Sequence, residues 1–380
     1  MTRRLKVVHV GKFYPPHAGG MESHLELLCR TTRDQVDVEV IVSADGPRTE
    51  REVAGGIPVT RVGTRLTLAS ASFNPGMARA IRRARADVVH FHHPNPTGVL
   101  SYFASGARGP LVVTYHSDIV RQKVLGPMVS PLVHALLRRA GAIIASSPQY
   151  AASSAVLQRH AARVRVLPFG IDAAEFQQAD PARVERIRAE HGPRIVFAAG
   201  RLVYYKGFDV LVRAMRAVDA RLLIAGGGPL GGELRALAAA EGVAGRVTLL
   251  GPVPDLRPYY HAADVFALPA VARSEAFGIV QMEAMACGVP VVNTSLDSGV
   301  PFVSPHGETG LTVPPRDAGA LAAALTTLLD DPALRRRMGR AGRRRVEGEL
   351  SAARMAARTV ALYREVAGLP GPDPSPTDDR

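Results

Sequence analysis

The sequence predicts an α/β protein built from two doubly wound domains, each a parallel sheet covered by helices. Short apolar runs rich in valine and isoleucine alternate with amphipathic stretches along almost the whole chain, the pattern of strand–helix–strand units. The runs are apolar throughout instead of alternating with polar residues, as expected for strands buried on both faces. A length of 380 residues suits two domains of ~150 residues or more.

The first half of the chain begins with a strand and keeps the alternation. Strands are expected at 5–11, 36–43, 57–62, 87–93, 111–117, 142–147 and 163–170. Helical patterns cover 21–33, 76–85, 127–140 and 148–158. The alternation pauses at 171–192, which is polar and helical without a core strand, so we place the domain boundary within 168–192.

The second half resumes the same pattern. Strands are expected at 194–200, 220–225, 246–250, 264–268 and 289–293, and helices at 207–218, 230–241, 255–262, 278–287, 317–329, 332–346 and 350–367. We therefore expect an N-terminal domain over 1–170 and a C-terminal domain over 171–350. A helix over 351–369 would pack back towards the N-terminal domain, and the proline-rich tail 370–380 is expected to be disordered.

Composition excludes several classes of protein. Apolar residues make up 47 % of the chain and charged residues 21 %, which excludes a disordered chain. Two cysteines exclude a disulfide scaffold and suit a reducing compartment. No run reaches the ~18 apolar residues of a membrane-spanning helix, and Lys6 and His9 interrupt the N-terminal apolar run. We therefore expect a cytoplasmic protein without a signal peptide.

The net charge of +13 indicates an anionic partner without identifying it. Only four of the 47 basic residues are lysines, and this bias along the whole chain is typical of genome composition. Nucleic-acid binding is an alternative, but tryptophan is absent and no basic motif is interleaved with aromatic residues, so we predict no nucleic-acid partner. Peripheral contact with an anionic membrane at the inner face stays open as a second alternative.

The run GGGPLGG at 226–232 satisfies the dinucleotide fingerprint G-x-G-x-x-G through Gly226, Gly228 and Gly231. That fingerprint also requires an acidic residue about 20 positions later, at the end of the next strand. The next expected strand ends in Leu249 and Leu250. We therefore favour a tight glycine turn that approaches a phosphate or sugar, and keep an NAD(P)-dependent oxidoreductase as the alternative.

Two further loops at expected strand ends carry groups suited to anions. In 11–24, Gly19 and Gly20 open a helix, whose free N–H groups bind phosphate. In 200–209, Arg201 and Lys206 lie around a bend at a helix start and would serve a diphosphate. The alternatives are a plain tight turn in the first loop and solvated surface charge in the second.

The most specific segment is SEAFGIVQMEAMACGVPVV at 274–292. Glu275 is expected on a loop and Glu283 about one turn into the following helix, while Phe277, Gly278 and Ile279 lie where that helix begins. Carboxylates accept hydrogen bonds from sugar hydroxyls, and a helix N-terminus donates to phosphate. Both carboxylates could then face one ligand, although two glutamates at this spacing also occur by chance.

Together these loops resemble the retaining nucleotide-sugar glycosyltransferases of family 4, which have the GT-B fold. The shared motifs are GGME at 19–22, TYHSD at 114–118, PFGID at 168–172, GRLVYYKG at 200–207, GGGP at 226–229, ADVFALPA at 263–270, the E-x7-E block with EAMACGVPVV, and HGETGLTVPPRD at 306–317. Each motif alone is weak, but their order and spacing are specific. The resemblance covers about residues 5–350 and implies two Rossmann-like domains facing a cleft.

The resemblance implies that the N-terminal domain binds the acceptor and that the C-terminal domain binds the donor. The donor-binding residues, taken from both domains, would be Gly19, Gly20, Arg201, Lys206, Glu275, Phe277, Gly278, Ile279 and Glu283. Of these, Arg201 and Lys206 would grip the diphosphate, and the glycines at 19 and 20 would approach it from the other domain. Glu275 would bind the sugar and Glu283 the ribose, while residues 277–279 would lend backbone N–H groups.

On the N-terminal side, the resemblance places His116 near the sugar at the reaction centre; a structural histidine is the alternative. Asp118 would orient the acceptor or cap a turn. His90 and His92 share one strand face, which suits two zinc ligands. No nearby cysteine or acid completes a set, so we expect no metal there. The basic, partly apolar segment 120–139 could contact anionic lipid, cover a soluble acceptor or form a core helix.

The implied reaction moves a hexose from a nucleoside-diphosphate sugar to an acceptor hydroxyl with retention of configuration. Its product would be a polysaccharide, a glycolipid or a glycosylated metabolite, and the acceptor would be a sugar, lipid-linked or small molecule. We find no D-x-D triplet and expect neither a metal nor a cofactor. The segment 295–310 reads GVPF where the family usually has a diglycine–Pro–Glu run, which leaves the donor sugar and its base open.

Overall fold

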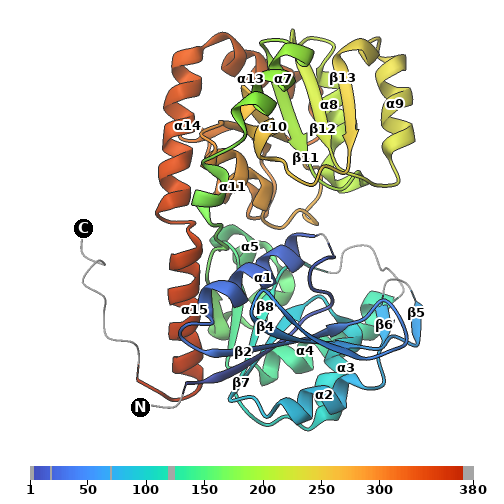
Figure 1. Cartoon of the computed structure of the whole chain (residues 1–380), viewed down its shortest axis with the longest axis vertical. Helices are drawn as coiled ribbons and strands as arrows, with labels where there is room; N and C mark the ends of the chain where they lie inside the picture. Colours follow the sequence, from blue (N-terminus) through green and yellow to red (C-terminus); the bar gives the residue numbers. More distant parts are fainter. Residues whose placement is uncertain (1–3, 18, 69–70, 119–124, 371–380) are drawn as a thin grey trace. The chain divides into compact units, whose positions relative to one another are not determined.

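The computed structural model describes residues 4–17, 19–68, 71–118 and 125–370. The chain forms two compact units (Figure 1). Unit 1 consists of Met1–Ser146, Ser154–Pro168 and Ala352–Arg380, and unit 2 of Ser147–Ser153 and Phe169–Ser351. The last segment of the chain therefore belongs to the unit that contains its beginning. Residues 371–380 of the tail that we expect to be disordered lie outside the described residues.

Unit 1 is built on one sheet with the strand order β10-β9-β8-β7-β1-β2-β4-β3. Its strands are β1 (Lys6–Val10), β2 (Asp37–Ser43), β3 (Glu50–Ala54), β4 (Ile57–Val62), β7 (Val88–His93), β8 (Leu111–Tyr115), β9 (Ala142–Ala145) and β10 (Val164–Val166). All neighbours run parallel except β3 and β4. The chain builds outward in both directions from β1 and β7, so the strand order reverses between them.

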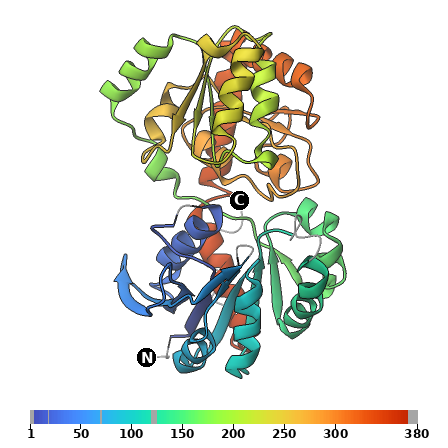
Figure 2. The ribbon, with the colours of Figure 1, turned by 90° about the vertical axis from the view of Figure 1, so that its right-hand side faces the viewer.

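The helices of unit 1 connect these strands and cover the sheet (Figure 2). They are α1 (Gly20–Thr32), α2 (Met77–Ala84), α3 (Pro96–Ser105), α4 (Leu125–Arg139), α6 (Ala155–Gln158) and α15 (Ala352–Val366), and a small separate ribbon pairs β5 (Leu66–Leu68) with β6 (Ala71–Phe73). The helices α1 and α15 pack against each other. Tyr363 of α15 is fully buried in the core formed by the strands.

Unit 2 has a fully parallel sheet with the order β13-β12-β11-β14-β15-β16. Its strands are β11 (Ile195–Ala199), β12 (Arg221–Ala225), β13 (Val247–Gly251), β14 (Val265–Leu268), β15 (Val291–Thr294) and β16 (Gly310–Val313). Here the strand order reverses between β11 and β14. In open α/β sheets ligands bind beyond the carboxyl ends of the strands at such a reversal.

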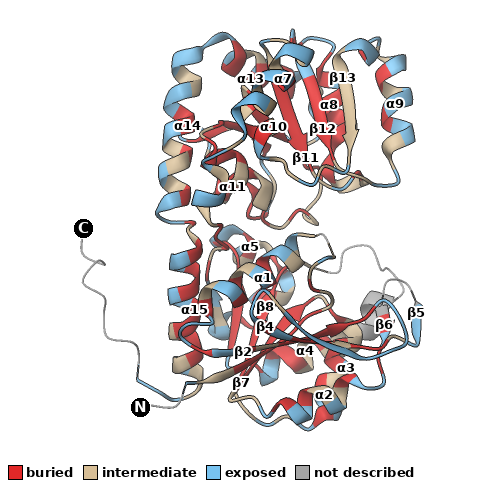
Figure 3. Cartoon of the chain, viewed as in Figure 1, coloured by how far each residue is buried: buried red, intermediate tan, exposed pale blue. Residues whose placement is uncertain are grey.

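The helices of unit 2 enclose two apolar cores, one on each face of the sheet. They are α5 (Pro148–Ser153), α7 (Pro181–His191), α8 (Phe208–Ala214), α9 (Gly231–Ala240), α10 (Arg257–Ala262), α11 (Ile279–Ala286), α12 (Val300–Val303), α13 (Ala318–Asp330) and α14 (Pro332–Glu347). Figure 3 shows the strands largely buried and the outer faces of α9 and α14 exposed. None of the helices in the described ranges is long and apolar enough to cross a membrane.

Local sequence explains where several helices begin. Asp180, Asp317 and Asp331 each accept a hydrogen bond from a backbone N–H in the first turn of the helix that follows, as N-cap residues do. The sequence analysis missed the helix α3, whose Pro, Gly and β-branched residues obscure its period, and the edge strands β3 and β16. The strand β3 is antiparallel and mostly exposed, so it lacks the apolar run by which the other strands were found.

Candidate functional site

The loops that follow β11 and β14 are joined to each other in unit 2. The two strands are neighbours, and the backbone N–H of Val271 donates to the carbonyl of Tyr205 over 2.8 Å. Gly207 lies so close to the second loop that a Cβ there would be 2.0 Å from the carbonyl oxygen of Pro269. Only glycine fits this approach, and its φ of 68° also favours glycine.

This junction brings Lys206 and Glu275 together. Lys206 Nζ lies 2.7 Å from Glu275 Oε2, and each side chain is only 10 % exposed. Lys206 ends a 3-10 turn before α8, and Glu275 lies in the loop before α11. An ion pair at this burial holds both groups in place, and it presents an ammonium beside a carboxylate at the strand-order reversal. The sequence predicts a donor-binding role for both residues, but their pairing follows only from the structure.

Glu283 lies on α11 and is held by a residue that the sequence analysis did not name. The hydroxyl of Tyr260 donates to Glu283 Oε2 over 2.6 Å. Burial raises the pKa of Glu283 above its ordinary value, while the hydrogen bond from Tyr260 and the charge of Lys206 act in the opposite direction. Burial also raises the pKa of Tyr260 well above its ordinary range, so the phenol keeps its proton.

Phe277, Gly278 and Ile279 lie at the start of α11. Gly278 is the N-cap residue with a φ of 79°, and Ile279 is the first helical residue. Phe277 is buried and packs edge-to-face against Phe169, with 5.0 Å between ring centroids. Burial of the Phe277 ring anchors the backbone of this loop. The first N–H groups of the helix have no acceptor within it and are therefore available to an anion.

The segment in which the chain departs from the usual family pattern supports this same loop. Gly299 N–H donates to the carbonyl of Ala276 over 2.6 Å. A Cβ at Gly299 would lie 2.6 Å from the ring of Phe277, and Phe302 lies 6.4 Å from that ring. The residues that differ from the family pattern therefore contact the loop at the start of α11 and help to hold it.

Arg201 is the second residue after β11 and is exposed. Its guanidinium has no carboxylate partner within the described ranges, in contrast to Lys206. An unpaired cation next to a helix start is free to bind an incoming anion.

The glycine run after β12 serves backbone packing. A Cβ at Gly226 would lie 2.0 Å from the carbonyl oxygen of Gly200, and one at Gly228 would lie 2.6 Å from that of Leu202. Leu202 N–H also donates to the carbonyl of Gly227 over 2.9 Å. These glycines therefore allow the loop that carries Arg201 to lie directly on the turn after β12. The glycines that match the dinucleotide fingerprint are thus explained by close packing of the backbone.

In unit 1, Gly19 and Gly20 are where the sequence places them. Gly19 is the N-cap residue of α1, and Gly20 begins that helix. Asp118 follows β8 and accepts hydrogen bonds from the hydroxyls of Tyr115 and Ser154, over 2.9 and 2.8 Å. Asp118 thus links two elements of unit 1.

His116 is buried and belongs to a series of hydrogen-bonded imidazoles. His9 Nδ1 lies 3.1 Å from His92 Nε2, and His92 Nδ1 lies 3.0 Å from His116 Nε2. Each contact needs one N–H and one lone pair, so the tautomers of the three rings depend on one another. Burial lowers the pKa of His9 to about 3 and that of His116 well below its ordinary value. These imidazoles are therefore uncharged at neutral pH.

His90 occupies a second position in this cluster. Its Nδ1 lies 2.6 Å from the hydroxyl of Tyr363 on α15, and its Nε2 lies 2.7 Å from Thr114 Oγ1. The ring nitrogens of His9, His90 and His92 lie within 4.8 Å of one another, as do those of His24, His92 and His116. His90 and His92, the two possible zinc ligands for which the sequence showed no third ligand, thus lie near further histidines. Both ring nitrogens of His90 and of His92 already have partners, however. Absence of a metal stays a prediction.

The residues that the sequence analysis missed come from distant parts of the chain. Tyr260, His9, His24 and Tyr363 carry no motif, and their positions depend on how strands and helices pack. His9 had one available signal, because it lies on the expected first strand, whose position beside His90 follows once the two strands pair in register.

The comparisons with known proteins agree with this architecture. Residues 181–345 match the family model described as glycosyl transferases group 1, and residues 18–175 match glycosyltransferase family 4. The D-rhamnosyltransferase WbpZ of Pseudomonas aeruginosa is 35 % identical over 342 residues, which are 88 % of this chain and 90 % of that protein. A GDP-mannose-dependent alpha-(1-6)-phosphatidylinositol monomannoside mannosyltransferase of Mycolicibacterium smegmatis is 33 % identical over 87 % of this chain and 91 % of its own.

Solved structures show the same fold. The sucrose-phosphate synthase of Thermosynechococcus elongatus superposes with a TM-score of 0.81 at 26 % identity, covering 96 % of this chain and 100 % of that one. The alternatives of a nucleic-acid-binding protein and an NAD(P)-dependent oxidoreductase receive no support from these matches. The two doubly wound domains expected from the sequence are confirmed, and the chain belongs to the family 4 glycosyltransferases, with the GT-B fold.

Proposed function

We propose that unit 2 binds a nucleoside-diphosphate sugar and that the enzyme moves its hexose to an acceptor hydroxyl with retention of configuration and without a metal. The observation that carries this proposal is the buried pair of Lys206 and Glu275 at the strand-order reversal, 2.7 Å apart. A donor of this class offers a diphosphate to the cation and sugar hydroxyls to the carboxylate.

The charges around the start of α11 suit the leaving group. When the sugar departs, negative charge grows on the diphosphate, and fixed positive groups aimed at it lower the barrier. Lys206 is held by its partner, Arg201 is unpaired within the described ranges, and the first turn of α11 adds N–H groups. These groups supply the electrostatic role that a divalent cation plays in other transferases.

In the proposed reaction the bond between the anomeric carbon and the diphosphate oxygen breaks, and a bond from the acceptor oxygen to that carbon forms on the same face. The acceptor proton passes to the departing phosphate oxygen. Glu275 binds the sugar hydroxyls in this scheme, and its ion pair with Lys206 holds the carboxylate in place. Glu283 binds the ribose, and Tyr260 orients its carboxylate.

For unit 1 we propose that His116 hydrogen-bonds the sugar as a neutral imidazole and that Asp118 orients the acceptor. Gly19 and Gly20 would bring the start of α1 to the diphosphate. A cytoplasmic location, with peripheral membrane contact as the alternative, remains an expectation from the sequence.

The relatives support a particular donor. One is named a D-rhamnosyltransferase and another is named GDP-mannose-dependent, and D-rhamnose is 6-deoxy-D-mannose. We propose a GDP-linked sugar of the manno configuration as the donor. The acceptor would be a hydroxyl of a glycan or a glycolipid.

The test is a thermal-shift titration of the full chain with GDP, UDP, ADP and NADH, followed by GDP-mannose turnover with and without EDTA. We expect GDP to give the largest stabilisation and EDTA to have no effect. Arg201→Gln should weaken GDP binding about tenfold, the loss of one charge-assisted hydrogen bond, whereas Arg213→Gln on α8 serves as the control. Stabilisation by NADH alone, or loss of turnover in EDTA with recovery in manganese, would contradict the proposal.

A further inference from the structure

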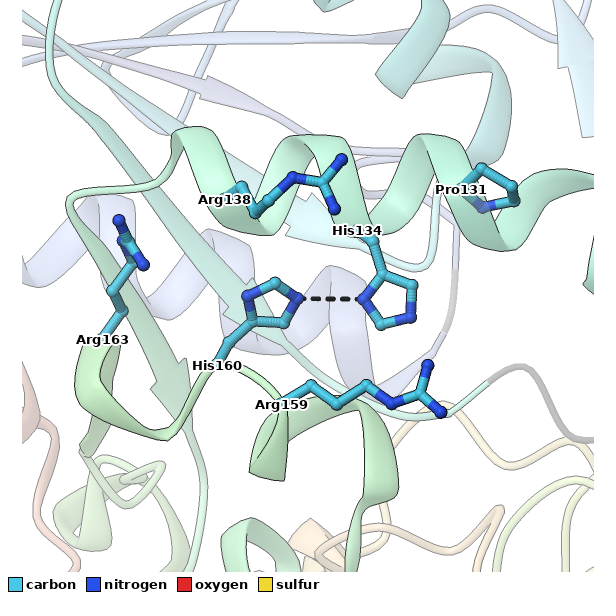
Figure 4. Close-up of a pocket in the computed structure, with 6 residues that line it drawn as sticks. All are labelled: Pro131, His134, Arg138, Arg159, His160 and Arg163. Carbon is cyan, nitrogen blue, oxygen red and sulfur yellow. Dashed lines mark hydrogen bonds between the residues drawn. The ribbon is translucent and has the colours of Figure 1, made fainter.

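A pocket in unit 1 is lined by basic and imidazole side chains (Figure 4). It has a volume of about 530 Å³ and is bounded by Pro131, His134, Arg138, Arg159, His160 and Arg163. None of the described residues that line it is acidic. Three guanidiniums, which stay charged at any physiological pH, therefore face one space together with two imidazoles.

The pocket is distinct from the proposed transfer site. Arg138 lies in the last turn of α4, which leads into β9, and Arg163 directly precedes β10. Both therefore lie at the amino ends of these parallel strands. His116 follows the carboxyl end of β8, where ligands of open α/β sheets bind.

The centre of the pocket is a hydrogen-bonded pair of histidines. His134 Nδ1 lies 2.9 Å from His160 Nε2, and His160 is only 7 % exposed. In Figure 4 the pair lies between Arg138 on one side and Arg159 on the other, with Arg163 beside His160. His134 and Arg138 are four residues apart on α4, so they share one face of the helix.

The arginines of the pocket lack a partner of opposite charge among the residues that the structure describes. Within the described ranges, neither Arg138 nor Arg159 nor Arg163 forms an ion pair or a side-chain hydrogen bond. By contrast, the nearby Arg165 pairs with Glu365, and Arg139 donates to the carbonyls of Arg108 and Gly109. Burial, and then the charges of Arg159 and Arg138, lower the pKa of His134. Burial, followed by the charge of His134 and those of the surrounding arginines, lowers the pKa of His160. Like-charged groups gathered without a counter-charge repel one another, and a bound anion would remove that repulsion.

We propose that this pocket binds a phosphoryl group. A tetrahedral phosphate presents oxygens in several directions and accepts from several guanidinium forks at once, whereas a planar carboxylate engages one fork well. The group can belong to a lipid headgroup or to a free phosphate ester. The bound anion also favours one proton on the pair of histidines, which face Arg138, Arg159 and Arg163.

The test compares the full-length chain with two double variants. Arg138→Gln/Arg163→Gln removes two charges from the pocket. Arg82→Gln/Arg83→Gln removes two charges from exposed positions of α2 in the same unit and serves as the matched control. Both should keep the wild-type thermal midpoint, because all four side chains are exposed.

Binding is measured with inorganic phosphate and glycerol 3-phosphate by calorimetry, and with phosphatidylcholine vesicles with and without phosphatidic acid by flotation. We expect the pocket variant to lose at least about tenfold in affinity and the control less than about twofold. Loss confined to vesicles identifies a lipid source, and loss confined to the soluble probes identifies a free ester.

The proposal is overturned if the wild type binds none of these probes, or if both double variants weaken binding equally. The second outcome would indicate general attraction to a basic surface. Nitrogen-15 shifts of His134 and His160 provide an independent measurement, since they should move on addition of phosphate in the wild type and in the control. None of these measurements requires glycosyl transfer, so the result is independent of the proposed function.

Discussion

Lys206 Nζ and Glu275 Oε2 lie 2.7 Å apart in an ion pair that joins the loops after two neighbouring strands of unit 2. Each side chain is only 10 % exposed. Removing one member of such a pair leaves the other charge buried without a partner. Removing both members leaves no unpaired buried charge. Stability and catalysis should therefore respond differently to single and double substitutions.

We expect Lys206→Met and Glu275→Gln each to lower the free energy of unfolding by about 2–4 kcal/mol. The double variant should return to within about 1 kcal/mol of the wild type, yet all three should lose transfer activity at least about 100-fold. Urea unfolding and initial rates measure the two effects. The exposed pair of Asp209 and Arg213 on α8 is the control, with a coupling below about 0.5 kcal/mol. Transfer activity in the double variant would show that neither residue belongs to the proposed site.

The carboxyl group of Glu283 provides a pH-dependent prediction. Its pKa is raised, chiefly by burial, so the folded protein holds the proton of Glu283 more strongly than the unfolded chain does. As pH rises above the unfolded pKa, ionisation in the folded state costs free energy that Glu283→Gln does not pay. The amide can still accept the hydrogen bond from Tyr260.

Glu283→Gln should therefore gain stability over the wild type as pH rises from 4 to 7, while its affinity for GDP falls about tenfold. Urea unfolding at several pH values and calorimetry with GDP measure the two effects. Tyr260→Phe should also weaken GDP binding, because it frees the carboxylate to rotate. A stability difference that stayed constant with pH would contradict the assigned burial of Glu283.

The glycines after β12 differ in what they permit, and alanine substitutions should show this. Gly226→Ala places a Cβ against the carbonyl of Gly200 at a φ of 138° and should cost at least about 2 kcal/mol. It should also raise the KM for the donor, because the displaced loop carries Arg201.

Gly232 belongs to the same run but has open space around its Cβ position and is the second residue of α9. Gly232→Ala should therefore stabilise the protein by up to about 1 kcal/mol. Thermal unfolding and donor titration measure both variants. Equal effects of the two substitutions would indicate that the close approach of the backbone has no energetic consequence.

The buried histidines predict acid sensitivity of unit 1. Burial lowers the pKa of His9 and of His24 to about 3, below the value of about 6.5 in the unfolded chain. The unfolded state therefore takes up protons first as pH falls below 6.5, and the stability that neutral histidines provide above that pH is lost. Each of these two groups should cost about 2 kcal/mol between pH 7 and pH 5.

All histidines of this cluster belong to unit 1, so its amides should lose hydrogen-exchange protection before those of unit 2 as the pH is lowered. Mass-spectrometric exchange at pH 7, 6 and 5 with rate correction measures this. His9→Phe and His24→Leu should flatten the pH dependence if they fold. Uniform loss of protection in both units would argue against a neutral histidine cluster.

Much of the fold follows from local pattern. The continuous apolar runs identified most of the strands of both sheets, because parallel strands are buried on both faces. The expected helix at 278–287 corresponds to α11 at Ile279–Ala286, with Glu283 inside it and Glu275 on the loop before it. The helix α3 and the edge strand β3 were not predicted, because α3 lacks a clear helical period and β3 lacks a continuous apolar run.

The sequence alone was enough to identify which residues of unit 2 lie at strand ends, because loops after parallel strands share one edge of a sheet. It could not identify the pairing of Lys206 with Glu275, the bond from Tyr260 to Glu283, or the contact of His90 with Tyr363 from the end of the chain. Those contacts depend on strand order and on which helix covers which face. Local pattern determines whether a segment is buried, but its neighbours are decided only when the sheets assemble and bring together residues far apart in the chain.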